Sequence, residues 1–155
     1  MGGFLPDGRP TTLFEAHIFY QETKGKYAAT HPTLCVAKWN RKLYARTPEG
    51  NWDRLEQARA LDRVAADRST SWGRFQIMGF NHVAAGFDKL DDFLAAMAHS
   101  EGRQLAAFVA FLRSKGLDKP LREHRWADFA KGYNGAAYAE NQYDTKLAAA
   151  WRKHQ

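Results

Sequence analysis

The sequence contains a single cysteine, Cys35, among its 155 residues. One thiol allows no disulfide within the chain and no cysteine-rich metal site. No apolar run approaches the roughly 18 residues that a membrane-spanning helix needs. The opening residues, Met1 to Gly8, have neither the basic segment nor the long apolar segment of a signal peptide. We therefore expect synthesis in the cytoplasm without membrane insertion.

The residue patterns of metal and nucleotide sites are also missing. The six histidines are scattered, and none has the spacing of a zinc site or of a His-Glu-x-x-His segment. The sequence has no glycine-rich phosphate loop and no serine nucleophile elbow. These absences predict a protein with no bound metal and no other cofactor.

The composition, with 45% hydrophobic and 26% charged residues, is that of a globular protein. The chain has 23 Lys and Arg against 17 Asp and Glu, which leaves a net charge of +6. An anionic partner is therefore expected, and nucleic acid, a membrane surface and an acidic cell-wall polymer all qualify. The charges alternate in sign at Asp53-Arg54, Asp62-Arg63 and Asp67-Arg68, which is typical of solvated faces and argues against nucleic acid.

Hydrophobic periodicity predicts a mainly α-helical single domain over residues 1–155, with an irregular or short-hairpin N-terminal third. Residues 1–12 are rich in glycine and proline, and Leu34–Val36 is a brief β-like run. Asn51 is the expected N-cap of a long helix. Helices are predicted over 13–23, 51–67, 91–98, 101–114 and 126–133, from 143 into the basic cluster 152–154, and briefly after Phe80 until Gly86.

The predicted helix 101–114 is amphipathic. We expect it to bury the face that carries Leu105, Phe108, Val109 and Leu112, and to stop at Gly116.

A polar segment, Ser69–Met78, places Gln76 among apolar residues, where a buried amide needs hydrogen-bond partners. One interpretation is a turn between two helices, in which Gln76 satisfies loop carbonyls. The other is the wall of a cleft, in which Gln76 offers a donor and an acceptor to a polar ligand such as a sugar.

A later segment, Phe129–Tyr138, pairs Tyr133 with Asn134 between glycines. Asn134-Gly135 is an ordinary turn signal, and Tyr133 could be a core residue with its hydroxyl tied to the backbone. Tyr and Asn beside small residues also suit a carbohydrate groove. Together with Gln76, they raise the expectation of one shared cleft.

Glycoside chemistry needs a carboxyl group that delivers a proton to the leaving oxygen. Asp7, within Pro-Asp-Gly, is expected to form a turn. Glu15 is flanked by large apolar residues, an environment that favours the protonated form that a general acid needs. The alternative for Glu15 is an exposed or arginine-paired helix residue.

Four blocks of residues, taken in order over nearly the whole chain, are similar to the N-acetylmuramidase catalytic domain of phage endolysins. The central and late blocks resemble, more loosely, elements of soluble lytic transglycosylases and goose-type lysozymes, so the resemblance implies a lysozyme-like fold. The blocks are 3–10, 13–19, 71–81 and 132–135 together with 143–148.

The resemblance implies cleavage of the β-1,4 bond between N-acetylmuramic acid and N-acetylglucosamine in peptidoglycan. Gln76 and Tyr133 would line the groove near the scissile bond, Asn134 would support it, and Ser71 would lie at the same cleft. The partner would be the glycan strand. An endolysin accumulates in the host cytoplasm and acts on the wall after a separate membrane pore releases it.

In this family the expected general acid is a glutamate in a Val-Glu-Ser stretch, at the end of a helix just before the Gly-Phe-Leu-Pro-Asp-Gly loop. The sequence begins inside that junction, so we expect the first helix and its glutamate to be missing. Glu15 is then the remaining candidate for the acid or for a carboxylate that contacts substrate. The alternatives are a catalytically impaired fragment that binds peptidoglycan, and a lytic transglycosylase.

Overall fold

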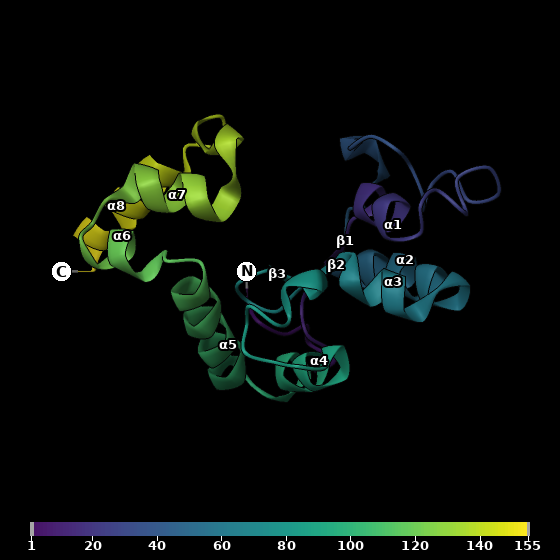
Figure 1. Cartoon of the computed structure of the whole chain (residues 1–155), viewed down its shortest axis with the longest axis horizontal. Helices are drawn as coiled ribbons and strands as arrows, with labels where there is room; N and C mark the ends of the chain where they lie inside the picture. The colour runs from purple at the N-terminus through teal and green to yellow at the C-terminus, as the bar shows by residue number, and fades with distance from the viewer. Residues whose placement is uncertain (1, 155) are drawn as a thin grey trace. The chain divides into compact units, whose positions relative to one another are not determined.

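The computed structural model describes residues 2–154, apart from the side chain of Ala137. The chain forms two compact units, Met1–Phe108 and Val109–Gln155, and the division falls within the helix α5 (Glu101–Ser114). Within the described residues, the regular elements are eight α-helices, three short 3₁₀ helices and one three-stranded sheet (Figure 1). The prediction of a mainly helical protein is confirmed.

The first residues form a tight hairpin, as one of the two predictions for 1–12 had it. Phe4 and Pro10 make an antiparallel bridge, and Gly8 has a φ of +86°. Asp7 accepts hydrogen bonds from the backbone N–H and the guanidinium of Arg9. The prediction that Asp7 forms a turn is confirmed.

The sheet of the first unit is antiparallel, with β1 (Thr12–Phe14), β2 (Thr70–Trp72) and β3 (Ile77–Met78) in that order. The predicted helix 13–23 is partly wrong, because its first residues belong to β1 and α1 spans Ala16–Glu22. The β-like run Leu34–Val36 is not a strand. Leu34 lies in a turn, and its side chain is buried although it belongs to no strand.

Two helices, α2 (Pro48–Leu61) and α3 (Arg63–Arg68), replace the single predicted helix 51–67. Thr47, and not Asn51, caps α2, since its hydroxyl accepts from the N–H of Gly50. Asp62 is extended, with a φ of −158°, and its carboxylate accepts from the N–H of Ala65 at the start of α3. A capping aspartate therefore interrupts an otherwise continuous helical pattern.

The short helix expected after Phe80 is also wrong. The strand β3 leads directly into a 3₁₀ helix, Gly79–Asn81, and turns follow up to Gly86. Gly79 lies against the backbone of Asp67, where a Cβ atom would come within 2.1 Å of the carbonyl oxygen. The chain crosses α3 at this point, which only a glycine permits.

Buried aromatic rings and one buried ion pair hold the first unit together. Trp52 of α2 meets Trp72 of β2 edge to face, with ring centroids 5.8 Å apart. The side chain of Asp67 is 1% exposed, and Arg59 donates to its carboxylate at 2.7 Å. The prediction that the Asp67-Arg68 pair lies on a solvated face is therefore wrong for Asp67.

The helices α4 (Leu90–His99) and α5 closely match their predictions, and Gly116, with a φ of +67°, follows the end of α5. The predicted buried face of α5 is only partly right. Leu112 is buried, but Leu105 is 50% exposed and Val109 is 37% exposed.

Gln104 explains why the buried face of α5 differs from the expectation. Its side chain is fully buried and donates to the carbonyls of Gly3 and Met97. Its oxygen accepts from the backbone N–H of Arg74. Because all these polar groups are paired, a glutamine can occupy this core position without the cost of an unsatisfied amide.

The second unit consists of the end of α5 and four further elements: α6 (Asp118–Arg122), α7 (Trp126–Asn134), a 3₁₀ helix (Ala136–Ala139) and α8 (Tyr143–Lys153). The predicted helices at 126 and 143 are confirmed, whereas α6 was not predicted. Figure 1 shows α7 beside α8 within this unit. Every helix among residues 2–154 is too short or too polar to cross a bilayer.

Candidate functional site

Ser71 and Gln76 meet at the hairpin between β2 and β3. The Ser71 hydroxyl donates to Oε1 of Gln76 at 2.8 Å, and Nε2 of Gln76 donates to the carbonyl of Gly73 at 2.9 Å. Gln76 therefore satisfies a loop carbonyl, as one interpretation expected, but the turn joins two strands and not two helices. An amide has two N–H groups and two acceptor positions, so this half-buried side chain keeps further hydrogen-bonding capacity.

The register of the sheet places Ser71 on the less buried face. Leu13 pairs with Ser71, and Ser71 pairs with Met78, so these three side chains share one face. Leu13 and Met78 are half-buried. The opposite face is buried throughout and carries Thr12, Phe14, Thr70, Trp72 and Ile77.

Glu15 lies directly after β1, at the N-cap position of α1 but without a side-chain capping bond, so it is not the helix residue that one alternative expected. Its backbone N–H donates to the carbonyl of Ser69, which fixes it beside the strand β2. Its side chain is 16% exposed, and Nδ1 of His17 lies 3.4 Å from its Oε2. Within the described residues, no arginine forms an ion pair with this carboxylate.

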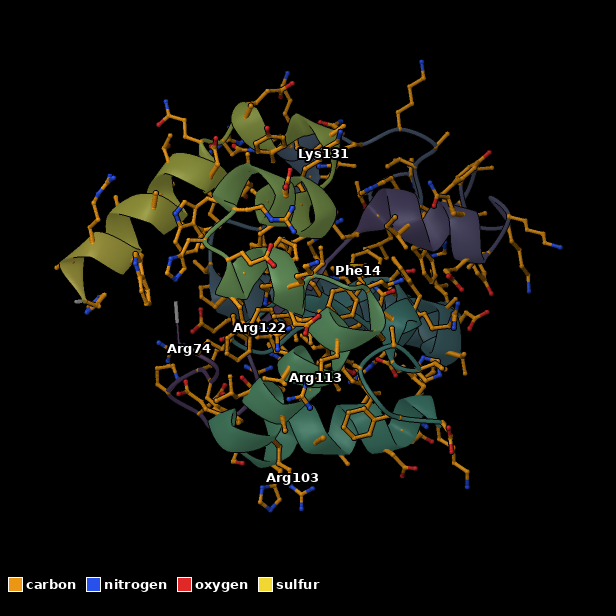
Figure 2. The ribbon with its side chains drawn as sticks, turned by 60° about the vertical axis from the view of Figure 1, so that its left-hand side comes forward. Phe14, Arg74, Arg103, Arg113, Arg122 and Lys131 are labelled. Carbon is orange, nitrogen blue, oxygen red and sulfur yellow. The ribbon has the colours of Figure 1, made fainter. Side chains whose placement is uncertain are left out.

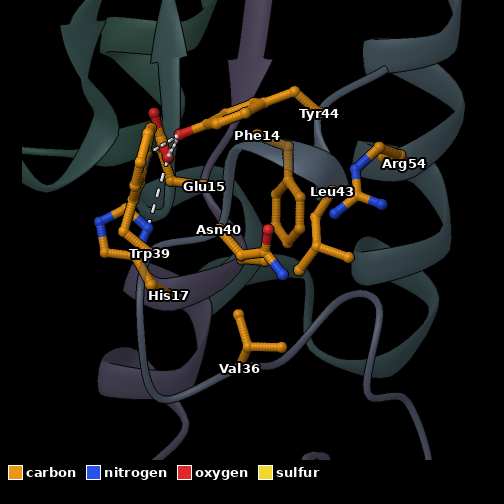
Figure 3. A pocket seen from close by; sticks show the side chains of 10 residues that line it. Phe14, Glu15, His17, Val36, Trp39, Asn40, Leu43, Tyr44 and Arg54 are labelled. Carbon is orange, nitrogen blue, oxygen red and sulfur yellow. Dashed lines mark hydrogen bonds and ion pairs between the residues drawn. The ribbon is translucent and has the colours of Figure 1, made fainter.

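A chain of hydrogen bonds leads away from Glu15 (Figure 3). The Tyr44 hydroxyl donates to Oε2 of Glu15 at 2.5 Å, and the indole N–H of Trp39 donates to the Tyr44 oxygen at 2.7 Å. Burial and the neighbouring carboxylate raise the pKa of Tyr44 far above its usual value. Tyr44 is therefore a permanent donor to Glu15 at any physiological pH.

These groups line a pocket of the first unit, together with Phe14, Val36, Leu43 and Arg54. Arg54 is half-buried, and its guanidinium lies 5.6 Å from the centre of the Phe14 ring. Burial lowers the pKa of Arg54. The large apolar neighbours expected around Glu15 are thus only part of its surroundings, since a phenol and an imidazole contact the carboxylate directly.

Tyr133 and Asn134 are the last two residues of α7, and Gly135 ends the helix with a φ of +82°. The Tyr133 ring stacks on Phe129 at 5.7 Å and meets Phe111 edge to face at 6.0 Å. Burial raises the pKa of Tyr133 to about 12. Asn134 is exposed.

The structure thus brings Ser71 and Gln76 together and places Glu15 directly after β1, the strand in which Leu13 pairs with Ser71. Tyr133 and Asn134 belong to the second unit, so the shared cleft stays a prediction. Trp39, Tyr44 and His17 were not singled out from the sequence, because no spacing rule connects Glu15 with a residue 29 positions away. Among residues 2–154, no three Asp, Glu, His or Cys side chains are grouped in a way that could hold a metal ion.

A family model described as Muramidase, N-acetylmuramidase, matches residues 1–155. The chain belongs to the N-acetylmuramidase family. It is 33% identical over 122 residues to the endolysin of Enterobacteria phage PRD1, covering 69% of this chain and 80% of that protein. The resemblance drawn from the four sequence blocks is therefore confirmed.

A crystal structure of the Burkholderia AP3 phage endolysin is also similar to this muramidase-family chain. The TM-score is 0.87 and the sequences are 44% identical, over 98% of this chain. The chain spans 58% of the length of that endolysin. The similarity confirms the predicted mainly helical, lysozyme-like fold, shared here with a phage endolysin.

Proposed function

We propose that this muramidase-family chain cleaves the β-1,4 bond between N-acetylmuramic acid and N-acetylglucosamine in peptidoglycan. The observation that carries the proposal is the family match along residues 1–155. The similarity to two phage endolysins supports a role at the bacterial cell wall. In this proposal the protein is made in the host cytoplasm and reaches the wall after release.

The surroundings of Glu15 support it as the carboxylate that contacts the substrate. Other carboxylates of the first unit are paired with arginines, such as Glu22 with Arg68 and Glu101 with Arg74. A carboxylate paired with an arginine is a poor proton donor, because the cation favours the charged form. Glu15 instead contacts a phenol and an imidazole, and among residues 2–154 no arginine forms an ion pair with it.

The remaining proposed contacts are polar groups near the ends of their elements. Gln76 would use the remaining N–H group and acceptor position of its amide to bind the N-acetyl and hydroxyl groups of a sugar. Ser71 would hold that amide in position. In the second unit, Tyr133 and Asn134 would contact the glycan from the end of α7. No cofactor enters this chemistry.

The test is digestion of purified sacculi, with mass spectrometry of the released fragments. Fragments with reducing N-acetylmuramic acid ends would support hydrolysis. Fragments with 1,6-anhydro ends would make the chain a lytic transglycosylase. Sedimentation with sacculi and no released fragments would make it a binding module.

The role of Glu15 is tested by Glu15→Gln with Glu49→Gln as the matched control, since Glu49 is an exposed residue in the first turn of α2. We expect Glu15→Gln to lower kcat by at least about 100-fold with the fold and wall affinity unchanged. The control should retain full activity. Equal, measurable activities of both variants would remove Glu15 from the mechanism.

A further inference from the structure

The segment between Glu22 and Glu49 has an extreme charge. Residues 23–48 contain no Asp or Glu, and the Lys and Arg side chains of the rest of the chain balance its 17 acidic residues. The whole net charge of +6 therefore belongs to this one segment. Its six cationic residues are Lys24, Lys26, Lys38, Arg41, Lys42 and Arg46.

These six cations stand apart from the other charged residues that the structure describes. None of them forms an ion pair with a carboxylate within the described part of the chain, whereas Arg9, Arg59 and Arg68 all do. Lys38, Arg41, Lys42 and Arg46 are also exposed. An exposed cluster of one sign without counter-charges attracts anionic ligands.

Trp39 follows Lys38 in the sequence, precedes Arg41 and Lys42 by two and three residues, and is 59% exposed. Its position is nevertheless fixed, because its N–H donates to Tyr44, which in turn donates to Glu15 (Figure 3). The Tyr44 ring is tilted by 54° at 6.3 Å and does not stack on the indole. A large aromatic ring is thus held in one orientation and remains open to solvent. Such pre-organisation lowers the entropic cost of binding.

We propose that Trp39, Lys38, Arg41 and Lys42 form a platform for the glycan strand, on which a sugar ring packs against the indole and the peptide-stem carboxylates meet the three cations. This inference rests on the proposed function and adds to it a second contact region, beyond Glu15, Ser71 and Gln76. The hydrogen-bonded connection from Trp39 through Tyr44 to Glu15 favours the glycan over other anions, because it links the platform to the proposed reacting carboxylate.

Three variants separate the aromatic from the electrostatic contribution to binding. Trp39→Ala should raise the KM for sacculi about tenfold, with kcat changed by less than about threefold. Trp39→Phe keeps an aromatic ring and should raise the KM by less than Trp39→Ala does. The triple variant Lys38→Gln, Arg41→Gln, Lys42→Gln should bind sacculi about tenfold more weakly at low salt and lose most of the salt dependence of binding.

The control for the triple variant carries the same change of charge elsewhere. Arg113→Gln (Arg113 is labelled in Figure 2), Arg152→Gln and Lys153→Gln remove three exposed cations of the second unit that form no ion pair within the described residues. This control should stay within about twofold of the parent. On glycan strands stripped of their peptide stems, the platform triple variant should equal the parent, whereas Trp39→Ala should still bind weakly.

The outcomes are distinct. If the parent protein neither cleaves nor sediments with sacculi, the proposed function fails and the platform with it. If the parent acts on sacculi but Trp39→Ala keeps its KM, or the two triple variants bind alike, the platform alone is overturned. If the platform triple variant loses binding to duplex DNA or to phosphatidylglycerol vesicles while its binding to sacculi is unchanged, the glycan is overturned as the ligand of the platform.

Discussion

The phenol of Tyr44 donates a 2.5 Å hydrogen bond to the carboxylate of Glu15, a residue 29 positions earlier in the chain. Because the pKa of Tyr44 is raised by burial and by this carboxylate, the donor proton is retained at neutral pH. Tyr44 therefore acts as a positioning residue that holds one oxygen of Glu15 in place.

Tyr44→Phe removes this hydrogen bond and keeps the ring. We expect kcat on sacculi to fall about tenfold while KM changes little, because the carboxylate loses its fixed orientation. Tyr143→Phe, at a partly exposed position of α8, should leave kcat unchanged. A Tyr44→Phe variant with the kcat of the parent would show that Glu15 needs no such support.

Gln76 adopts a left-handed backbone conformation with a φ of +52°, which costs about 1 kcal/mol for a residue with a side chain. Gln76→Ala keeps this strain and loses both side-chain hydrogen bonds, so we expect the free energy of unfolding to fall by about 1–2 kcal/mol. Gln76→Gly loses the same bonds but relieves the strain. Chemical denaturation should therefore find Gln76→Gly more stable than Gln76→Ala, and the reverse order would contradict the strained turn.

Arg59 pairs with two carboxylates that differ in burial. Asp67 is 1% exposed, and Glu56 is 56% exposed. Asp67→Ala leaves the half-buried guanidinium without its main partner and should lower the free energy of unfolding by about 3–5 kcal/mol. Glu56→Ala should change it by less than about 1 kcal/mol. Equal effects in thermal denaturation would show that burial does not govern this pair.

The buried phenol of Tyr133 is expected to lower the free energy of unfolding at alkaline pH. Its pKa is about 12 in the folded chain, because it is buried, and near 10 in an unfolded chain. Between these values only the unfolded chain releases the proton. The contribution of Tyr133 is therefore complete below about pH 10, and above it the free energy of unfolding falls by up to about 1.4 kcal/mol per pH unit.

Comparison of the parent with Tyr133→Phe isolates this effect. Unfolding curves measured from pH 9 to pH 12 should show a shallower decline for the variant, whereas Tyr20→Phe should follow the parent. Parallel declines for all three proteins would mean that Tyr133 ionises freely in the folded chain.

The helices α4, α5 and α7 could be predicted because each has an apolar stripe, and Gly116 after α5 and Gly135 after α7 mark two of their ends. The helix α6 was missed because five residues are too few to show such a stripe. The strands could not be predicted, since two or three residues leave no measurable alternation. The break at Asp62 was missed because a capping aspartate inside a helical pattern looks like an ordinary surface residue.

The candidate site was predictable where its members are close in sequence, as Ser71 and Gln76 are. The partners of Glu15 were not, because Trp39 and Tyr44 lie on either side of a 3₁₀ helix of only three residues, Arg41–Leu43, which has no apolar periodicity. The prediction of the buried face of α5 was partly wrong for a similar reason. Gln104 is accepted in the core by backbone groups of Gly3, Met97 and Arg74, which no helical periodicity can reveal.

The single thiol of the chain lies inside the cationic segment. Cys35 is 1% exposed, and its sulfur is 3.7 Å from the hydroxyl of Thr23. A thiol-specific reagent can reach this sulfur only when residues 23–48 open locally. The rate of labelling therefore reports how often that segment opens, and a ligand seated on it would slow the reaction in a protein that needs no engineered probe.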